Sequence, residues 1–138
     1  MTENTTTADC VFCKIIAGDI PSRKVDEDDH SYSFLDVAPF HPGHTLVVPK
    51  RHVDSFLADP PALSEITPAI DRVSRLVTQR LDAEGMNLFS SAGAIAGQEV
   101  FHLHVHLVPR YADSGACGIS SVSNRPRPTR TWRRYGNN

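Results

Sequence analysis

The chain has 138 residues, of which 40% are apolar and 22% charged, and this length suits one compact domain and excludes two of ordinary size. No segment approaches an apolar membrane span, and residues 1–9 are polar and rich in threonine, without the basic and apolar regions of a secretory signal. We therefore expect a cytoplasmic protein with no membrane partner.

Charge is uneven along the chain, although the net charge is only −2. Residues 114–138 contain five arginines and no acidic residue, so this tail has a charge of +5 and the remainder −7. With Trp132 and Tyr135, the tail could bind nucleic acid by charge and stacking, or dock on the acidic body or on a second subunit. Because the whole protein is not basic, we expect docking and no nucleic-acid partner.

Residues 1–9 are expected to be a disordered lead, and residues 10–17 a short helix that ends at Gly18. The two-residue spacing of Cys10 and Cys13 suits a metal or redox role better than a disulfide, and Cys117 is the third cysteine.

Residues 26–30 read as a charged turn and residues 31–35 as a strand. A proline-punctuated loop, residues 36–44, then delivers His44 to a strand at 45–49. Capping signals at Asp59 and Thr67, each followed by proline, predict two helices at 61–66 and 68–83. Residues 86–90 are expected to form a strand, followed by a loop rich in glycine, alanine and serine up to Gln98.

Residues 101–110, Phe-His-Leu-His-Val-His-Leu-Val-Pro-Arg, place three histidines at two-residue spacing. On a strand, His102, His104 and His106 would share one face while the intervening apolar residues pack on the core. Besides a catalytic role, the three histidines could be a polar strand face that arose by chance, or ligands of a transition metal. A single zinc ion bound by all three is disfavoured, because their backbone positions on a strand extend over about 13 Å, which is too wide for three bonds near 2.1 Å.

This triplet, with Gly97 and Gln98 before it, resembles the signature of the histidine triad (HIT) nucleotide hydrolases and transferases, and the similarity extends over residues 10–110. It implies an α+β, HIT-like fold for residues 10–113. That fold would have an antiparallel sheet of about five strands with one long and one or two short helices, paired as a homodimer.

The resemblance further implies a hydrolase that releases a nucleoside monophosphate, AMP or GMP, from a phosphoramidate or a dinucleoside polyphosphate. His104 would be the nucleophile, kept neutral by a hydrogen bond from its other ring nitrogen to a main-chain carbonyl. His106 and His44 would bracket the phosphate, His102 completes the catalytic set, Gln98 would be a further donor and Gly97 would let the backbone approach. No metal is required for this chemistry.

A purine nucleotide is the implied substrate, with the Asp36 carboxylate accepting hydrogen bonds from both ribose hydroxyls. The residues implied to line the base pocket are also readable as ordinary core; they are Phe12, Ile15, Ile20, Phe34 and Leu46.

Two positions depart from the family pattern. Ser91 stands where asparagine is usual, and Glu99 where nucleoside phosphoramidases have a serine that contacts the leaving group. The alternatives are therefore a nucleotidyl transferase that passes the group to phosphate or a sugar phosphate, and a nucleotide-binding regulatory module with slow turnover.

The family pattern also implies a structural zinc bound by two thiolates and two imidazoles, those of Cys10, Cys13, His52 and His102. Four such ligands form a closed site, which suits a structural rather than a catalytic ion. The alternative is two buried thiols beside a surface histidine.

Overall fold

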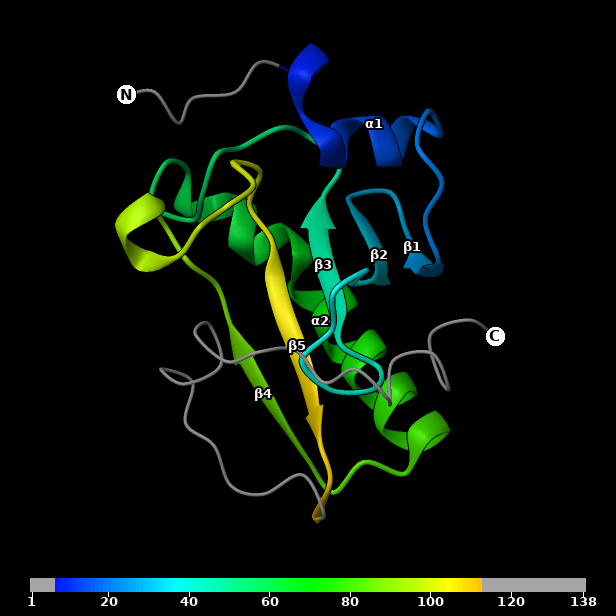
Figure 1. Cartoon of the computed structure of the whole chain (residues 1–138). Helices are drawn as coiled ribbons and strands as arrows, with labels where there is room; N and C mark the ends of the chain where they lie inside the picture. The colour runs from blue at the N-terminus through cyan, green and yellow to red at the C-terminus, as the bar shows by residue number, and fades with distance from the viewer. Residues whose placement is uncertain (1–6, 113–138) are drawn as a thin grey trace.

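Five antiparallel strands form one sheet, and a long helix lies along one of its faces (Figure 1). The computed structural model describes residues 7–112. Within them the strand order is β1-β2-β3-β5-β4, which confirms the predicted α+β class and the sheet of about five strands. The strands are β1 (Lys24–Glu27), β2 (Ser31–Leu35), β3 (Thr45–Pro49), β4 (Gly85–Phe89) and β5 (Val105–Arg110), and the helices are α1 (Val11–Ala17) and α2 (Pro60–Leu81).

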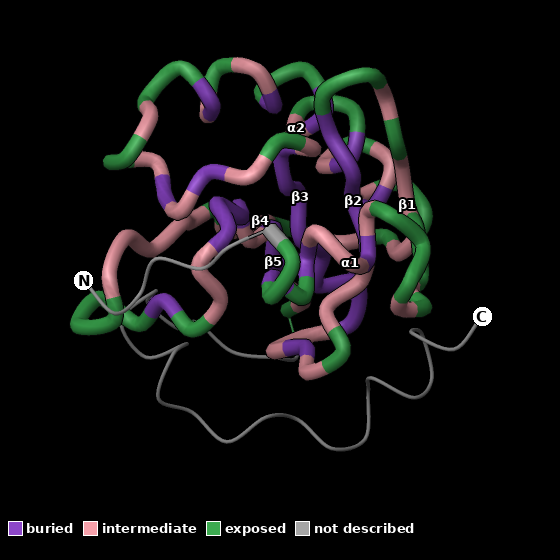
Figure 2. Tube along the Cα trace, turned by 90° about the horizontal axis from the view of Figure 1, so that it is seen from above, coloured by how far each residue is buried: buried purple, intermediate pink, exposed green. Residues whose placement is uncertain are grey.

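Successive side chains of the central strands point alternately to the face of the sheet covered by α2 and to the opposite face, which carries His106 and is called the functional face below. Val47, Val105 and Leu107 pack against α2, so the residues between them point to the opposite face. His106 lies on that opposite face, directly across from Leu46 of β3. Figure 2 shows that β2 and β3 are buried along most of their length, so this part of the sheet is a rigid support for side chains on the functional face.

Helix α1 confirms the helix predicted at residues 10–17. Cys10 is its N-cap, with Sγ accepting the Cys13 N–H at 3.4 Å, and Gly18 ends it in the left-handed region at φ +88°. Phe12 and Ile15 are the buried residues of this short helix, and they pack against Leu46 and Val48 on the face opposite α2. The packing of α1 therefore places the thiols of Cys10 and Cys13 at the edge of the functional face.

The prediction of two helices at 61–66 and 68–83 was wrong, because α2 continues through Pro68. Pro68 is exposed, so its ring faces solvent and the helix loses only one main-chain hydrogen bond there. The apolar stripe that packs on the sheet runs unbroken past the proline through Ile66, Ala69 and Val73. Burial of this stripe outweighs the local cost of the proline.

The charged turn predicted at residues 26–30 was partly wrong, because β1 occupies its first half. The turn itself is tighter: Asp28 Oδ1 accepts the N–H groups of His30 and Ser31 at 2.8 and 2.7 Å. Arg72 of α2 donates to Asp26 and Asp28, which fastens the sheet edge to the helix.

The strand predicted for all of residues 101–110 begins only at Val105. The preceding segment bonds to the last residue of β3 and to the segment that follows it. Leu103 N–H donates to the Val53 carbonyl at 2.6 Å, and His102 Nε2–H donates to the Pro49 carbonyl at 2.8 Å. The three histidines therefore do not form one row on a single strand.

Several predictions concern the ends of the chain. Thr7–Asp9 forms a 3-10 turn where the lead was expected to be disordered, while residues 1–6 and the basic tail with Cys117 lie outside the described residues. No helix within residues 7–112 is both long and apolar enough to span a bilayer. The cytoplasmic location and the homodimer stay predictions.

Both steric crowding and a left-handed backbone conformation favour glycine at position 43. Alanine variants of Gly43 and Gly18 can separate these two effects. It adopts φ +86°, and a Cβ atom there would collide with the Leu81 side chain and press on Pro109 and Val77. We expect Gly43→Ala to lower the free energy of unfolding by about 2–4 kcal/mol, from left-handed strain plus overpacking. Gly18 has nearly the same φ and open space around it, so Gly18→Ala should cost only about 1–2 kcal/mol. Equal losses in urea unfolding would contradict this account.

Candidate functional site

His104 has one ring nitrogen committed to the main chain and the other free to react. Its Nδ1 lies 2.7 Å from the carbonyl oxygen of His102, and a carbonyl can only accept, so Nδ1 bears the hydrogen and Nε2 keeps its lone pair. The side chain is buried against Phe12, whose ring meets it edge-on at a centroid distance of 5.1 Å. Burial lowers the pKa of His104 below its ordinary value, so the ring is neutral at pH 7.

His44 and His106 form a hydrogen-bonded pair whose protons are also fixed by the main chain. The Phe40 N–H donates to His44 Nδ1 at 3.1 Å, so the hydrogen of a neutral His44 is on Nε2. That N–H donates to His106 Nδ1 at 2.9 Å, which leaves His106 with its hydrogen on Nε2. Burial, followed by the neighbouring His104 and His44, lowers the pKa of His106 to about 3. His106 is thus a neutral hydrogen-bond donor.

Aromatic rings hold this histidine cluster, defined as His44, His104 and His106. Phe89 stacks on His106 at 4.5 Å between centroids, and Phe40 stacks on His44 at 5.2 Å. The rings of His104 and His106 are 4.9 Å apart. Sequence reasoning missed both phenylalanines, since nothing in a sequence pairs a residue of β4 or of the 36–44 loop with a particular imidazole.

Asp36 lies at the edge of the histidine cluster. Its Oδ1 accepts the Ala38 N–H at 2.9 Å, and its Oδ2 is 3.5 Å from His44 Nε2. One carboxylate oxygen is therefore used to shape the 36–44 loop, and the other faces the cluster. The binding of ribose hydroxyls by Asp36 stays a prediction.

The loop before the triplet is closed by Gln98, which is only 4% exposed. Its Nε2 donates to the carbonyls of Asp54 and Val100 at 2.6 and 3.0 Å, and its Oε1 accepts the Gly93 N–H at 2.8 Å. Both amide hydrogens are thus engaged with the main chain, which differs from the predicted role as a donor to phosphate. In this conformation Gln98 organises the loop.

Three other predicted residues lie on or beside the same loop. Gly97 follows the 3-10 turn η2 (Ala94–Ala96) with φ +99°, a conformation that favours glycine whatever binds nearby. Ser91 is half-buried at the start of the loop and Glu99 is exposed just after its end. Their roles toward a leaving group stay predictions.

The residues predicted for the base pocket gather in one apolar cluster beside His104. Phe34 and Leu46 are cross-strand neighbours in β2 and β3, and the Phe12 ring meets Phe34 at 5.4 Å. Ile15 is buried in the same cluster, and Ile20 packs against it. The structure brings these five residues together, while their contact with a base stays a prediction.

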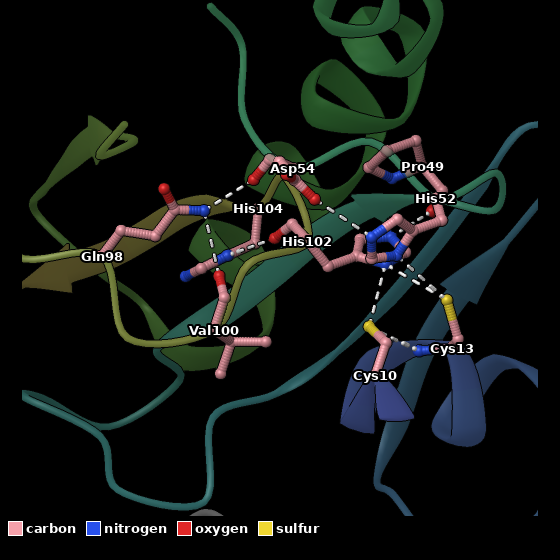
Figure 3. A network of polar contacts seen from close by, with 9 residues as sticks. All are labelled: Cys10, Cys13, Pro49, His52, Asp54, Gln98, Val100, His102 and His104. Atoms are coloured by element: carbon pink, nitrogen blue, oxygen red, sulfur yellow. Dashed lines mark hydrogen bonds and ion pairs between the residues drawn. The ribbon is translucent and has the colours of Figure 1, made fainter. Parts of the chain in front are cut away.

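Cys10, Cys13, His52 and His102, the Cys2His2 cluster, have their four ligand atoms within 4.8 Å of one another. The Nδ1 of His102 is 3.4 Å from the Cys10 sulfur and 3.5 Å from that of Cys13, and the Nδ1 of His52 is 3.4 Å from the Cys13 sulfur (Figure 3). Zinc bonds of 2.3 Å to sulfur and near 2.05 Å to nitrogen give a tetrahedral edge of roughly 3.5 Å. The spacing therefore fits one zinc ion.

Proton positions in the Cys2His2 cluster favour a cation as well. His102 Nε2–H donates to the Pro49 carbonyl, and His52 Nε2 lies 3.1 Å from the Asp54 carboxylate, so both Nδ1 lone pairs face the sulfurs. Outer hydrogen bonds of this kind accompany most metal-bound histidines. Burial, followed by the contact with Cys10, raises the pKa of the Cys13 thiol to about 12, so paired thiolates here need a positive ion between them.

His102 was predicted both in the catalytic set and among the metal ligands. Its two ring nitrogens are engaged with the Pro49 carbonyl and with the thiols, so neither is free for a phosphate. The geometry assigns its side chain to the Cys2His2 cluster, and its main-chain carbonyl to His104. Asp54 was missed, although a carboxylate two residues after a candidate metal histidine is a usable signal.

Asp36, His44 and His106 also have ligand atoms within 4.8 Å of one another. The proton pattern distinguishes this group from the Cys2His2 cluster. Because the Phe40 N–H occupies His44 Nδ1, a neutral His44 has no lone pair at Nε2 to offer a cation. The site thus consists of a zinc-compatible cluster and a separate, proton-bearing cluster of imidazoles.

Comparison with known proteins agrees with this arrangement. Residues 17–113 match the family model described as the HIT domain. "Protein hit" of Bacillus subtilis is 42% identical over 79% of this chain and 76% of its own length. "Adenosine 5'-monophosphoramidase HNT1" of Candida albicans is 37% identical over 81% and 77%, and "Adenylylsulfatase HINT3" of Arabidopsis thaliana is 38% identical over 74% and 52%.

Among solved structures, a zinc-bound histidine triad family protein from Mycobacterium smegmatis superposes with a TM-score of 0.73. It is 34% identical in sequence, and the match covers 86% of this chain and 91% of that one. The chain belongs to the HIT domain family.

Proposed function

We propose that the protein is a nucleotide hydrolase that cleaves a nucleoside monophosphate from its leaving group through a covalent intermediate on His104. The observation that supports this most is the bond from His104 Nδ1 to the His102 carbonyl, because it presents a neutral Nε2 lone pair. A neutral imidazole is a competent nucleophile toward phosphorus, and a covalent intermediate divides one difficult step into two easier ones.

In the first step the Nε2 lone pair of His104 attacks phosphorus, and the leaving group departs with the electron pair of its bond to phosphorus and takes up a proton from solvent. In the second step a water oxygen attacks the same phosphorus and gives up a proton to solvent, the phosphorus–nitrogen bond breaks with its electron pair returning to His104 Nε2, and the nucleoside monophosphate leaves. His106, with its hydrogen on Nε2, would donate to a phosphoryl oxygen as negative charge develops there. His44 keeps His106 in this protonation state.

Two relatives support AMP as the transferred group, since their names describe an adenylylsulfatase and an adenosine 5'-monophosphoramidase. The apolar cluster that contains Phe12 and Leu46 lies beside His104 and is chemically suited to a purine. The two names imply different leaving groups, sulfate and an amine, which differ in charge, so the relatives do not agree on one leaving group. A phosphoramidate or a dinucleoside polyphosphate is the substrate class that we propose here.

We further propose that the Cys2His2 cluster binds one structural zinc ion. Its distances and inward-facing lone pairs support this, and a related structure is described as zinc-bound. With all four ligands from protein, such an ion would stabilise the fold near the site and would leave the chemistry to the imidazoles.

The covalent step can be observed directly by intact-protein mass spectrometry after rapid mixing with an adenosine phosphoramidate. We expect a transient adduct of one AMP on the wild type and none on His104→Ala, whose turnover should fall by about 10³-fold or more. His30→Ala is the matched control, because His30 is an exposed histidine of the β1–β2 turn. Normal turnover by His104→Ala would contradict the proposal, and AMP binding without adduct or product would favour a binding module.

Formation of the adduct should lose rate at a lower pH than the one at which an ordinary histidine titrates. Because burial lowers the pKa of His104, more than half of this nucleophile is still neutral at pH 6.5. The rate constant for adduct formation should therefore reach half of its maximum only below pH 6.5. Rapid-quench measurements from pH 8 to 5 check this, and a half-maximal rate at pH 6.5 would be evidence against a desolvated His104.

Zinc binding should depend on the thiols of the cluster. We expect the purified wild type to contain about one zinc per chain by elemental analysis, and Cys10→Ser to lose most of it together with several degrees of melting temperature. Cys117→Ser is the control, because that cysteine lies in the tail, and it should retain the metal. Equal zinc contents in the two variants would contradict the assignment.

A further inference from the structure

Asp54 makes two contacts that lead to different parts of the site. Its carboxylate Oδ1 is 3.1 Å from His52 Nε2, and its main-chain carbonyl accepts Gln98 Nε2–H at 2.6 Å (Figure 3). Asp54 therefore contacts both a residue of the Cys2His2 cluster and the residue that closes the loop before the triplet.

Hydrogen bonds between its two ends close the loop at residues 93–98. Gln98 uses both its main-chain N–H and its side-chain oxygen on Gly93, through bonds of 3.1 Å to the Gly93 carbonyl and 2.8 Å from the Gly93 N–H. The second amide hydrogen of Gln98 is donated to Val100, just before His102. A shift of the Asp54 carbonyl would therefore be passed to the whole loop through one buried side chain.

The nucleophile is connected to the same two segments. Residues 52–54 and 98–103 are held together by the bond from Leu103 N–H to the Val53 carbonyl and by the Gln98–Asp54 bond. His104 takes its orientation from the carbonyl of His102. A cation bound to His52 and His102 would join these two segments from the other side, since the two rings are 5.1 Å apart.

We propose that Asp54 is a positioning residue that couples the Cys2His2 cluster to the 93–98 loop, so that loop order beside His104 depends on metal occupancy. This inference rests on the proposed zinc site and is independent of the proposed reaction. Without the ion, His52 loses one restraint, and the Asp54 carbonyl that anchors Gln98 becomes freer to move.

Hydrogen–deuterium exchange of the full chain, loaded with zinc or stripped by a chelator, tests the coupling. In the wild type, stripping should raise amide exchange of residues 93–104 by about tenfold or more, while amides in the middle of α2 change little. Asp54→Ala should bind zinc about 10- to 100-fold more weakly in competition with a chromophoric chelator, as expected when an outer carboxylate is lost. At saturating zinc its loop should still exchange faster than that of the wild type.

Asp54→Asn is the conservative variant, because its side-chain oxygen can still accept from His52. It should restore most of the zinc affinity and the slow exchange of the loop. Asp71→Ala, which removes a carboxylate from the exposed side of α2, should behave as wild type.

The outcomes separate the two proposals. A chain that takes up no zinc overturns both the metal site and the coupling. Stoichiometric zinc with equal loop exchange in the loaded and stripped forms overturns the coupling alone. The coupling is also overturned if Asp54→Ala at saturating zinc has the loop exchange of the wild type, or if Asp54→Asn is as impaired as Asp54→Ala.

Discussion

A carbonyl oxygen can only accept a hydrogen bond, and an amide N–H can only donate one. This elementary constraint determines which nitrogen of three buried imidazoles bears the proton. The carbonyls of Pro49 and His102 place hydrogens on His102 Nε2 and His104 Nδ1, while the Phe40 N–H places that of His44 on Nε2. The main-chain group that each ring meets therefore decides which of its nitrogens has a lone pair, and so which of the proposed roles of metal ligand, nucleophile or donor it could take.

The break in the histidine strand places the histidines of the triplet in two different environments. Had residues 101–110 formed one regular strand, the three imidazoles would point to one face and share one environment. Instead the ladder starts at Val105, and the residues before it bond to the segment after β3. His102 can then turn toward the thiols of α1 while His106 remains on the sheet. Separation of the Cys2His2 cluster from the histidine cluster follows from this change of backbone partner.

Much of this arrangement could be predicted from sequence, because it depends on local pattern. Strands β2 and β3 and the short helix before Gly18 were found from turn, proline and glycine signals. The continuation of α2 through Pro68 could not be predicted in the same way. The proline is a local signal for a helix boundary, whereas burial of the apolar stripe of α2 depends on the sheet beneath it. The main-chain partner that fixes the His104 tautomer could be predicted as a type of group. Its identity as His102 required the backbone path.

The residues that sequence reasoning missed share a physical reason. Phe89, Phe40 and Asp54 were missed because each one matters through contacts with residues that meet it only in three dimensions. A phenylalanine is apolar core in any pattern, and an isolated aspartate is usually a turn or surface residue. Resemblance to a family finds the residues that take part in chemistry, whereas the residues that hold them emerge from packing.

The aromatic neighbours explain how neutral imidazoles can be both buried and well ordered. An imidazole that flips by half a turn about its Cβ–Cγ bond puts ring carbons where its nitrogens were, which would remove the hydrogen bonds that those nitrogens make. For His44, such a flip would break the bond from Phe40 N–H and the bond to His106 together, while Phe40 stacks on the ring. Loss of a hydrogen bond to a partly buried polar group costs about 1–3 kcal/mol. The rings are thus held in one protonation pattern before any substrate arrives, which is the preorganisation that the proposed charge stabilisation at phosphorus would require.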